Sequence, residues 1–322
     1  MSKRTKIWLI IAACLILVGC IAFGGVIAVL KWDFTKLSTV RYETNLHEIN
    51  ESYQNISIIT DTADVEFVPS VNSNTSVVCY EQQKSRHTVR VENGSLVIEL
   101  VDLRKWYEYI GISFANPKIT VYISEGEYGA LSIKSSTGKV EIPRDFRFES
   151  IDISESTGNV TSYACTSDYI KIKTSTGDIR VEGISAGALD LSASTGKVSL
   201  ADVTCEENVK INVSTGRTNV TNVKCQNIIS TGSTGGITFE NAIAAERFSV
   251  ERSTGSVKLD ACDAAEIYIK TDTGNVTGSL LSDKIFMVRS DTGSIEVPKT
   301  VTGGICEITT DTGDIKVNIK DR

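Results

Sequence analysis

Three aspartates are the residues whose type and spacing come nearest to a chemical site. Asp272, Asp291 and Asp311 each stand two positions before a glycine in segments that otherwise repeat. If those segments stack, the carboxylates form a row about 5 Å apart, and Ca²⁺ binds such oxygens. The alternative is that each Asp caps its own turn through backbone N–H groups. These three residues are the metal candidates, and no cofactor is predicted.

Catalytic chemistry has little support in the sequence. The two histidines, His47 and His87, lie outside the repeated segments and outside any known motif. A Ser-His-Asp or Cys-His site is therefore excluded from the repeats. Asp-Thr-Gly also occurs in aspartic proteases, but those enzymes use two copies in a different fold. The residues three positions after the repeat glycines mix acids, bases and hydroxyls, unlike the paired carboxylates of a glycosidase. We predict no catalytic residues and no enzyme; a glycan-active enzyme is the remaining catalytic alternative.

The segment from Arg104 to Tyr109 is the densest aromatic cluster in the chain. Trp, Tyr and Arg are enriched where proteins bind partners. Trp106, Tyr107 and Tyr109 are therefore candidate contacts with a partner or a glycan. The alternative is that they pack against the end of the domain.

The elements that position these residues come from a repeated tripeptide. Ser-Thr-Gly and then Asp-Thr-Gly recur every 19 or 20 residues. Glycine adopts positive φ without a Cβ penalty, which suits a corner in the chain. The predicted corner glycines are Gly138, Gly158, Gly177, Gly196, Gly216, Gly235, Gly255, Gly274, Gly293 and Gly313.

Apolar residues keep a fixed spacing from these glycines. They stand two and four positions after, and five and seven positions before, in most repeats; Val140, Ile142, Ile133 and Leu131 are one such set. Alternation by two predicts strands with one buried face. One repeat cannot bury that face alone, so neighbours must stack. The sequence predicts an all-β fold, with a parallel β-solenoid of about ten 19–20-residue coils over residues 129–322.

Residues 47–128 keep this pattern only in part. Asp61-Thr62-Ala63 looks like the same corner with Ala in place of Gly. Asn93-Gly94, between alternating apolar residues, is a strong hairpin signal. Because an open solenoid end needs a cover, we expect an irregular first coil, a hairpin and a cap here.

An uncharged run over residues 7–30 is long enough to cross a bilayer as one helix. Lys3, Arg4 and Lys6 precede it, which predicts a cytoplasmic tail over 1–6, a linker over 31–46 and an extracellular C-terminal domain. Two alternatives remain: a cleaved signal peptide, and lipidation of Cys20 in Leu17-Val18-Gly19-Cys20.

The charge is uneven along the chain. The formal net charge is −7, and residues 1–31 carry four bases and no acid, so −7 less +4 leaves −11 on the remainder. Such an acidic outer region repels phosphates, so no nucleic-acid partner is expected.

Three features together resemble a known family. They are Lys31-Trp32-Asp33-Phe34 after the apolar run, Asp61-Thr62-Ala63-Asp64-Val65, and the Ser-Thr-Gly-x-Val ladder. The chain resembles the putative-adhesin family of bacterial β-strand-repeat proteins, a domain of unknown function that includes LiaG-like envelope proteins. The resemblance implies a membrane-tethered outer domain linked to adhesion or envelope stress, and supplies no catalytic residues.

The predicted function is a non-enzymatic cell-surface module, adhesin-like or associated with the envelope. Its expected partners are the membrane, through residues 7–30, and an envelope polymer, a surface glycan or a membrane protein. The alternative is a regulatory or sensory membrane protein of an envelope-stress system.

Overall fold

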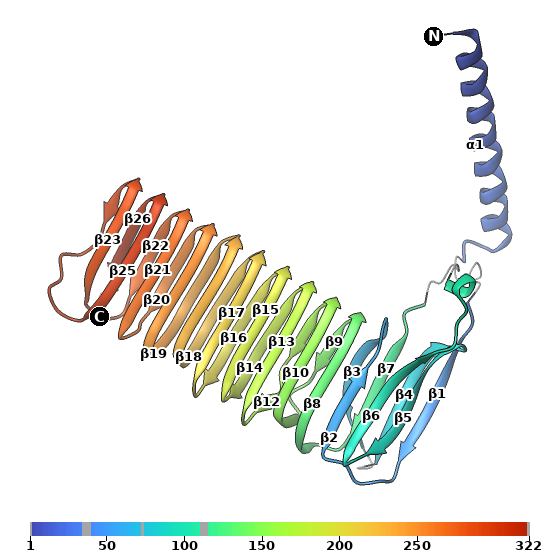
Figure 1. The fold of residues 1–322 in the computed structure, drawn as a ribbon, viewed down its shortest axis with the longest axis horizontal. Coiled ribbons are helices and arrows are strands. Elements are labelled where there is room, and N and C mark those ends of the chain that lie inside the picture. The colour runs from blue at the N-terminus through green and yellow to red at the C-terminus, as the bar shows by residue number, and fades with distance from the viewer. Residues whose placement is uncertain (1, 34–39, 72–73, 110–114, 321–322) are drawn as a thin grey trace.

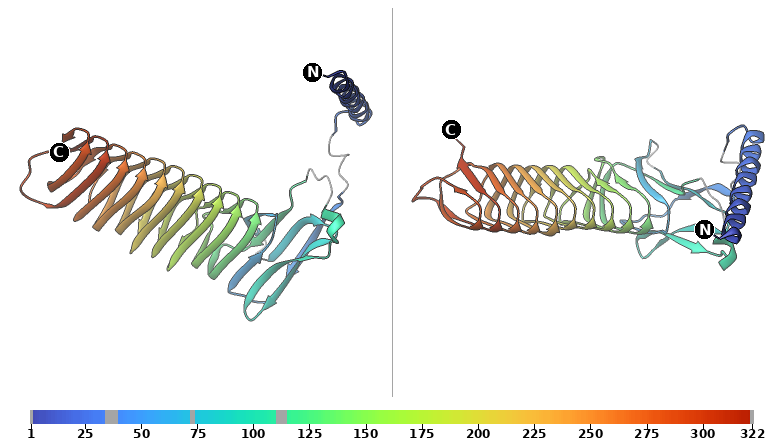
Figure 2. Two further views of the ribbon diagram at one scale, coloured as in Figure 1. Left: turned by 45° about the horizontal axis from the view of Figure 1, so that its top comes forward. Right: turned by 90° about the horizontal axis from the view of Figure 1, so that it is seen from above.

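The computed structural model describes residues 2–33, 40–71, 74–109 and 115–320. Helix α1 (Lys3–Val29) is long and apolar enough to cross a membrane. It begins before the apolar run because the Ser2 hydroxyl accepts the N–H of Thr5 at 3.2 Å. All strands belong to one sheet that winds into a long flattened coil (Figures 1 and 2).

Each coil of the solenoid has one strand before its corner glycine and one after it. The strands are β8 (Gly126–Thr137), β9 (Val140–Ile142), β10 (Phe146–Thr157), β11 (Val160–Ser162), β12 (Cys165–Thr166), β13 (Tyr169–Thr176), β14 (Ile179–Ala186), β15 (Ala188–Thr195), β16 (Val198–Cys205), β17 (Asn208–Thr215), β18 (Thr218–Thr234), β19 (Ile237–Thr254), β20 (Val257–Cys262), β21 (Glu266–Thr273), β22 (Val276–Leu280), β23 (Lys284–Thr292), β24 (Ile295–Glu296), β25 (Gly304–Thr312) and β26 (Ile315–Ile319). In the middle of the array, β18 and β19 each run from one coil into the next.

Neighbouring coils pair in parallel and without a register offset. Ile151 of β10 lies opposite Leu131 of β8 and Ile170 of β13, so equivalent apolar residues stack in columns. These columns form one continuous core along the solenoid. The predicted fold class, an all-β parallel solenoid of about ten coils preceded by one apolar helix, is confirmed.

The corner glycines are held by the stacking of the coils as well as by their own backbone. All ten have φ between 124° and 158°. A Cβ placed on Gly216 would lie 1.7 Å from the carbonyl oxygen of Gly196 in the preceding coil. Any other residue therefore meets both a strained φ and a backbone clash.

The coils do not all stack in the order in which they occur in the sequence. Strand β25 lies between β21 and β23, and β26 lies between β22 and β24. The last coil in the chain is thus the second from the end in space. Gly303 and Gly304 allow the returning chain to pass close to the carbonyls of Asp283 and Ala265, because a Cβ on either would clash with them.

At the N-terminal end, too, the order of the coils in space differs from their order in the chain. Its strands are β1 (Tyr42–Ile49), β2 (Asn55–Ile59), β3 (Asp64–Pro69), β4 (Thr75–Gln82), β5 (Ser85–Glu92), β6 (Ser95–Asp102) and β7 (Lys118–Ile123), with a 3₁₀ helix η2 (Trp106–Tyr109). The coil of β2 and β3 stacks on β8 and β9, while β6 and β7 lie outside it. Strands β5 and β6 form an antiparallel hairpin through Asn93 and Gly94, and β1 and β4 cover the other edge.

Candidate functional site

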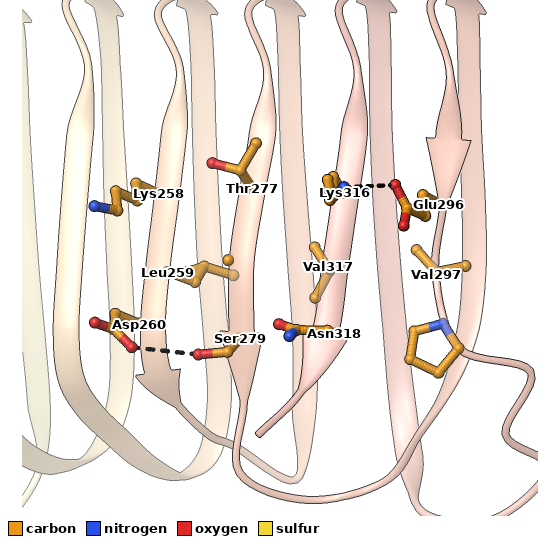
Figure 3. A pocket seen from close by; sticks show the side chains of 12 residues that line it. Lys258, Leu259, Asp260, Thr277, Ser279, Glu296, Val297, Lys316, Val317 and Asn318 are labelled. Carbon is orange, nitrogen blue, oxygen red and sulfur yellow. Dashed lines mark hydrogen bonds and ion pairs between the residues drawn. The ribbon is translucent and has the colours of Figure 1, made fainter. Parts of the chain in front are cut away.

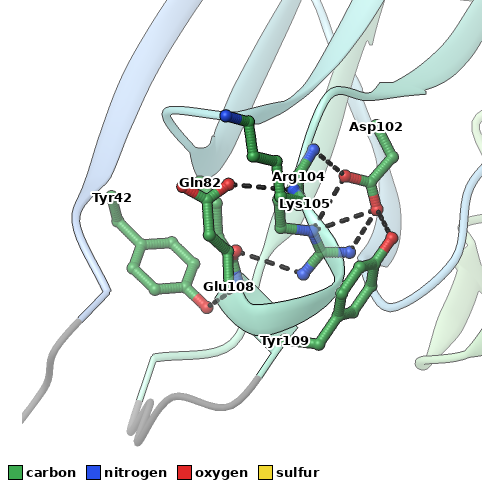
Figure 4. Close-up of polar contacts among 7 residues, drawn as sticks. All are labelled: Tyr42, Gln82, Asp102, Arg104, Lys105, Glu108 and Tyr109. Carbon is green, nitrogen blue, oxygen red and sulfur yellow. Dashed lines mark hydrogen bonds and ion pairs between the residues drawn. The ribbon is translucent and has the colours of Figure 1, made fainter.

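The aromatic segment predicted as a partner contact lies on the surface of the N-terminal cap (Figure 4). Trp106 is 78% exposed, and Tyr107 and Tyr109 are also exposed. This exposure favours a partner contact over packing against the end of the domain, and the partner contact stays a prediction. The Trp106 ring has one aromatic neighbour among the described residues, Tyr107, at 5.9 Å between ring centroids.

Polar contacts with Asp102 stabilise the conformation of this segment. The Arg104 guanidinium binds both carboxylate oxygens of Asp102, and it lies 4.4 Å from the ring centroid of Tyr109. The Tyr109 hydroxyl also donates to Asp102 at 3.0 Å. The hydrogen bonds from Arg104 lower the pKa of Asp102 to about 2, so this carboxylate stays ionised.

A buried polar network lies behind this surface and was missed by the sequence reasoning. The Thr60 hydroxyl lies 2.9 Å from Nε2 of His87, and Nδ1 of His87 lies 2.6 Å from Oε2 of Glu81. Asn45 donates to the other Glu81 oxygen at 2.7 Å. Burial opposes ionisation of Glu81, but the hydrogen bonds from His87 and Asn45 outweigh it and lower the pKa of the carboxyl.

The order hydroxyl, imidazole and carboxylate is that of a serine-hydrolase triad. With Glu81 ionised, Nδ1 of His87 can donate to the carboxylate, and the Thr60 hydroxyl is the partner of Nε2. However, Thr60 is buried, and the void beside the network has a volume of about 10 Å³, close to that of one water. The described geometry therefore joins the cap to the first coil without leaving room for a substrate.

The same network holds the one group of three metal-ligand atoms found among the described residues. One ligand atom each from Cys79, Glu81 and His87 lies within 4.8 Å of the others. Burial raises the pKa of the Cys79 thiol to about 12, and both nitrogens of His87 already have protein partners. Hydrogen bonds within the protein therefore explain the positions of Glu81 and His87 without a metal ion.

The candidate metal residues of the solenoid lie in adjacent strands, in an order that corrects the sequence prediction. Asp311 lies between Asp272 and Asp291, because the last coil is inserted before the preceding one. All three side chains are exposed, and Asp291 accepts a hydrogen bond from Arg289 at 3.0 Å. Calcium binding by this row stays a prediction.

An arginine is buried inside the solenoid. Arg252 is 3% exposed and donates to Val213 O, Thr218 Oγ1 and Ser230 Oγ. Burial lowers its pKa. Thr218 and Ser230 are two of the non-apolar residues in the otherwise apolar columns, and Gly232 leaves space for the guanidinium. The inward-pointing Arg252 thus explains why Thr218, Ser230 and Gly232 occupy positions where other coils have larger or apolar residues.

An open groove of about 730 Å³ lies on the face of the solenoid at its C-terminal end (Figure 3). Strand β24 pairs with β26 only at Ile295 and Glu296, so the outer edge of β26 is open beyond Lys316. Apolar surface lies beside seven polar residues in its lining: Lys258, Asp260, Thr277, Ser279, Glu296, Lys316 and Asn318. Two pairs among them are bonded, Lys316 with Glu296 and Ser279 with Asp260.

Few signals in the amino-acid sequence pointed to these sites. The groove depends on the short β24, and Pro298 was its only marker, because proline cannot continue a strand inside a sheet. The partners in the buried network are up to 42 residues apart, and no motif connects them. The Arg252 position was marked only by a charge in a column of mostly small or hydroxyl residues, where Glu155 is the other charged residue.

Comparison with known proteins gives a family and no established activity. The family model described as Toastrack DUF4097 matches residues 53–216 and 206–322. No functionally curated protein matches the chain.

Solved structures with related shapes include a "Putative lipid binding protein" from Parabacteroides distasonis, with 16% identity, a TM-score of 0.49, and coverage of 88% of this chain and 98% of that one. A "putative adhesin" from the same organism has 9% identity, a TM-score of 0.48, and coverage of 86% and 98%. A "putative adhesin" from Bacteroides fragilis has 14% identity, a TM-score of 0.40, and coverage of 87% and 97%. All three TM-scores are below 0.5, so the family match alone assigns the chain. The two matched segments together cover residues 53–322, and the chain therefore belongs to the Toastrack DUF4097 family.

Proposed function

We propose that this protein is a non-enzymatic cell-surface module that binds an envelope polymer or surface glycan in the C-terminal groove. The observation that carries the proposal is the position of the groove. It lies at the end of the solenoid opposite the cap that follows helix α1 (Figure 1). A helix that anchors the chain in the membrane would hold the cap near the bilayer, with the groove at the far end of the solenoid from the cap.

The lining of the groove supports a hydroxyl-rich ligand. Lys258 and Lys316 supply N–H donors, and Asp260 and Glu296 supply carboxylate acceptors. Asn318 offers both a donor and an acceptor. Such alternation suits a sugar, whose hydroxyl groups both donate and accept. The stacked coils fix the backbone positions from which these side chains extend, which lowers the entropy lost on binding.

Binding to isolated bacterial cell walls tests the proposal. Full-length protein in lipid nanodiscs is incubated with cell walls, either intact or stripped of anionic polymers, and the bound fraction is measured by sedimentation. We expect Lys258→Ala/Lys316→Ala/Asn318→Ala to weaken binding at least tenfold. The matched control is Lys171→Ala/Lys210→Ala, which removes two exposed lysines in the middle of the solenoid.

Two outcomes would contradict the proposal. Equal binding by the groove variant and the control would show that the groove is not the binding site. Turnover of cell-wall glycan by the wild-type protein would show that the module is an enzyme. The regulatory alternative is separated by deleting the gene and measuring adhesion beside the output of an envelope-stress reporter. A change in the reporter with unchanged adhesion favours regulation.

A further inference from the structure

The cap exposes a compact apolar surface, which we call the aromatic loop (Leu103–Tyr109). Leu103 is 75% exposed and Trp106 78% exposed, beside the exposed rings of Tyr107 and Tyr109. Holding this apolar area in water is unfavourable, and an exposed apolar patch of this kind usually marks an interaction site.

Ion pairs at both ends of the loop hold it in this conformation. The Arg104–Asp102 pair lies at its start, and the Glu108 carboxylate accepts from Lys84 and from the backbone N–H of Lys105. Each carboxylate here has a cationic partner, so none would have to enter a low-dielectric region unpaired. The aromatic rings therefore lie beside two carboxylates, Asp102 and Glu108, whose charges are neutralised.

The loop lies at the end of the domain that the membrane helix enters. Tyr42, the first residue of β1, is hydrogen-bonded to Gln82, and Gln82 accepts from Arg104 of the loop (Figure 4). Residues 30–41 separate α1 from β1, and a chain of this length spans at most about 40 Å. Figures 1 and 2 show η2 on the side of the cap nearest to α1.

We infer that the aromatic loop contacts the phospholipid surface and fixes the orientation of the solenoid on the membrane. Trp and Tyr partition into the bilayer interface because the ring is apolar and its N–H or O–H is polar. Leu103 adds an apolar group that can reach the acyl boundary, and the exposed side chain of Lys105 would lie within reach of lipid phosphates. This contact is independent of the ligand proposed for the distal groove.

Tryptophan fluorescence in vesicles tests the inference directly. The chain has three tryptophans, so Trp8→Phe/Trp32→Phe leaves Trp106 as the only one. This full-length variant is reconstituted in phosphatidylcholine vesicles, with and without bromine at the shallow acyl positions. We expect blue-shifted emission that bromolipid quenches at least twofold.

A matched control places the reporter at the other end of the molecule. Val301 is 87% exposed in the C-terminal loop, so Trp8→Phe/Trp32→Phe/Trp106→Phe/Val301→Trp should emit as a hydrated indole and stay unquenched. Emission from Trp106 that matches this control would overturn the inference. A change in Trp106 emission on adding cell-wall glycan, without any quenching by bromolipid, would assign the loop to a glycan instead.

Discussion

At the scale of single residues, each corner glycine satisfies two steric demands. Its φ is positive, and its missing Cβ leaves space for a carbonyl oxygen of the neighbouring coil. Only the first demand could be inferred from the sequence. The second is a property of stacking, because the clashing atom belongs to a residue 19 or 20 positions away in most coils.

The two demands can be separated by a pair of substitutions. Gly216→Ala should lower the free energy of unfolding by about 2–5 kcal/mol, since strain and a backbone clash both apply. Gly183 has φ +66° and open space around its missing Cβ, so Gly183→Ala should cost only about 1–2 kcal/mol. Thermal unfolding of the full-length protein, followed by circular dichroism, compares them. Equal losses would mean that stacking adds nothing at the corner.

Glu155 is a second residue whose environment is set by the stacked coils. It is 3% exposed in the inward corner column, and neither carboxyl oxygen has a hydrogen-bond partner. Burial raises the pKa of Glu155 to about 7, against weaker opposing effects of the nearby Ser135 hydroxyl and Thr157 backbone N–H. The folded state therefore binds a proton that the unfolded state releases near pH 4.5.

This difference predicts the pH dependence of stability. Because the pKa is raised on folding, the contribution of Glu155 should be most favourable below about pH 4.5 and should decline as pH rises to about 7. Glu155→Gln should therefore be more stable than wild type at pH 8, by about 1–3 kcal/mol, and nearly equal at pH 4. Unfolding midpoints at the two pH values check this. Glu149→Gln, an exposed neighbour on the same strand, should show no such difference; a gain that is equal at both pH values would contradict the assignment.

At the scale of elements, the coils resemble one another closely. Their order at the C-terminal end therefore depends on features that the repeat does not share. Strand β23 leaves Met287 exposed and β24 is only two residues long, so this coil can serve as the last layer. The coil of β25 and β26 buries Cys306, Ile308, Ile315 and Val317 on its inner face. The buried side chain of Lys284 binds Asp263 at 2.7 Å and fixes the start of β23.

Engineered disulfides test this order. Lys270 of β21 lies opposite Thr309 of β25, so Lys270→Cys/Thr309→Cys should oxidise readily. Arg289 of β23 lies one layer further, about 10 Å from Lys270, which is beyond the reach of a disulfide. Lys270→Cys/Arg289→Cys should therefore stay reduced. Mass spectrometry after mild oxidation measures disulfide formation in both variants. The opposite result would mean that the coils stack in sequence order.

At the scale of the whole molecule, the architecture separates two ends with different chemistry. The cap carries the aromatic loop and the connection to α1, and the distal end carries the polar groove (Figures 1 and 3). Between them the core is continuous, so the solenoid holds the two ends at a fixed separation. A rigid spacer of this kind suits a protein that acts at a distance from its anchor.

The topology predicted from the basic N-terminus has a direct test. We expect a membrane-impermeant maleimide to label Val301→Cys on intact cells, because the loop is exposed and the domain should lie outside. Ser2→Cys should be labelled only after permeabilisation. The wild-type chain measures the background from its own cysteines, most of which are buried or lie in α1. Labelling of Ser2→Cys alone on intact cells would show that the orientation is reversed.

The sequence by itself determined the fold class, because the fold rests on a short-range repeat. A Gly corner every 19 or 20 residues and apolar residues at fixed offsets define the strands, their buried faces and their register. The uncharged run in the same way predicted the apolar helix. These features depend on residue type and local spacing, which can be read along the chain.

The tertiary structure alone decided the features that depend on contacts between distant residues. A register shared by every coil allows several stacking orders, so the exchange of coils at both ends could not be derived from the period. The Thr60–His87–Glu81 network, the partners of Arg252 and the groove beside β24 join residues 6 to 60 positions apart. Their chemistry follows from which coil lies next to which, and a repeat that makes the coils alike carries no information about that choice.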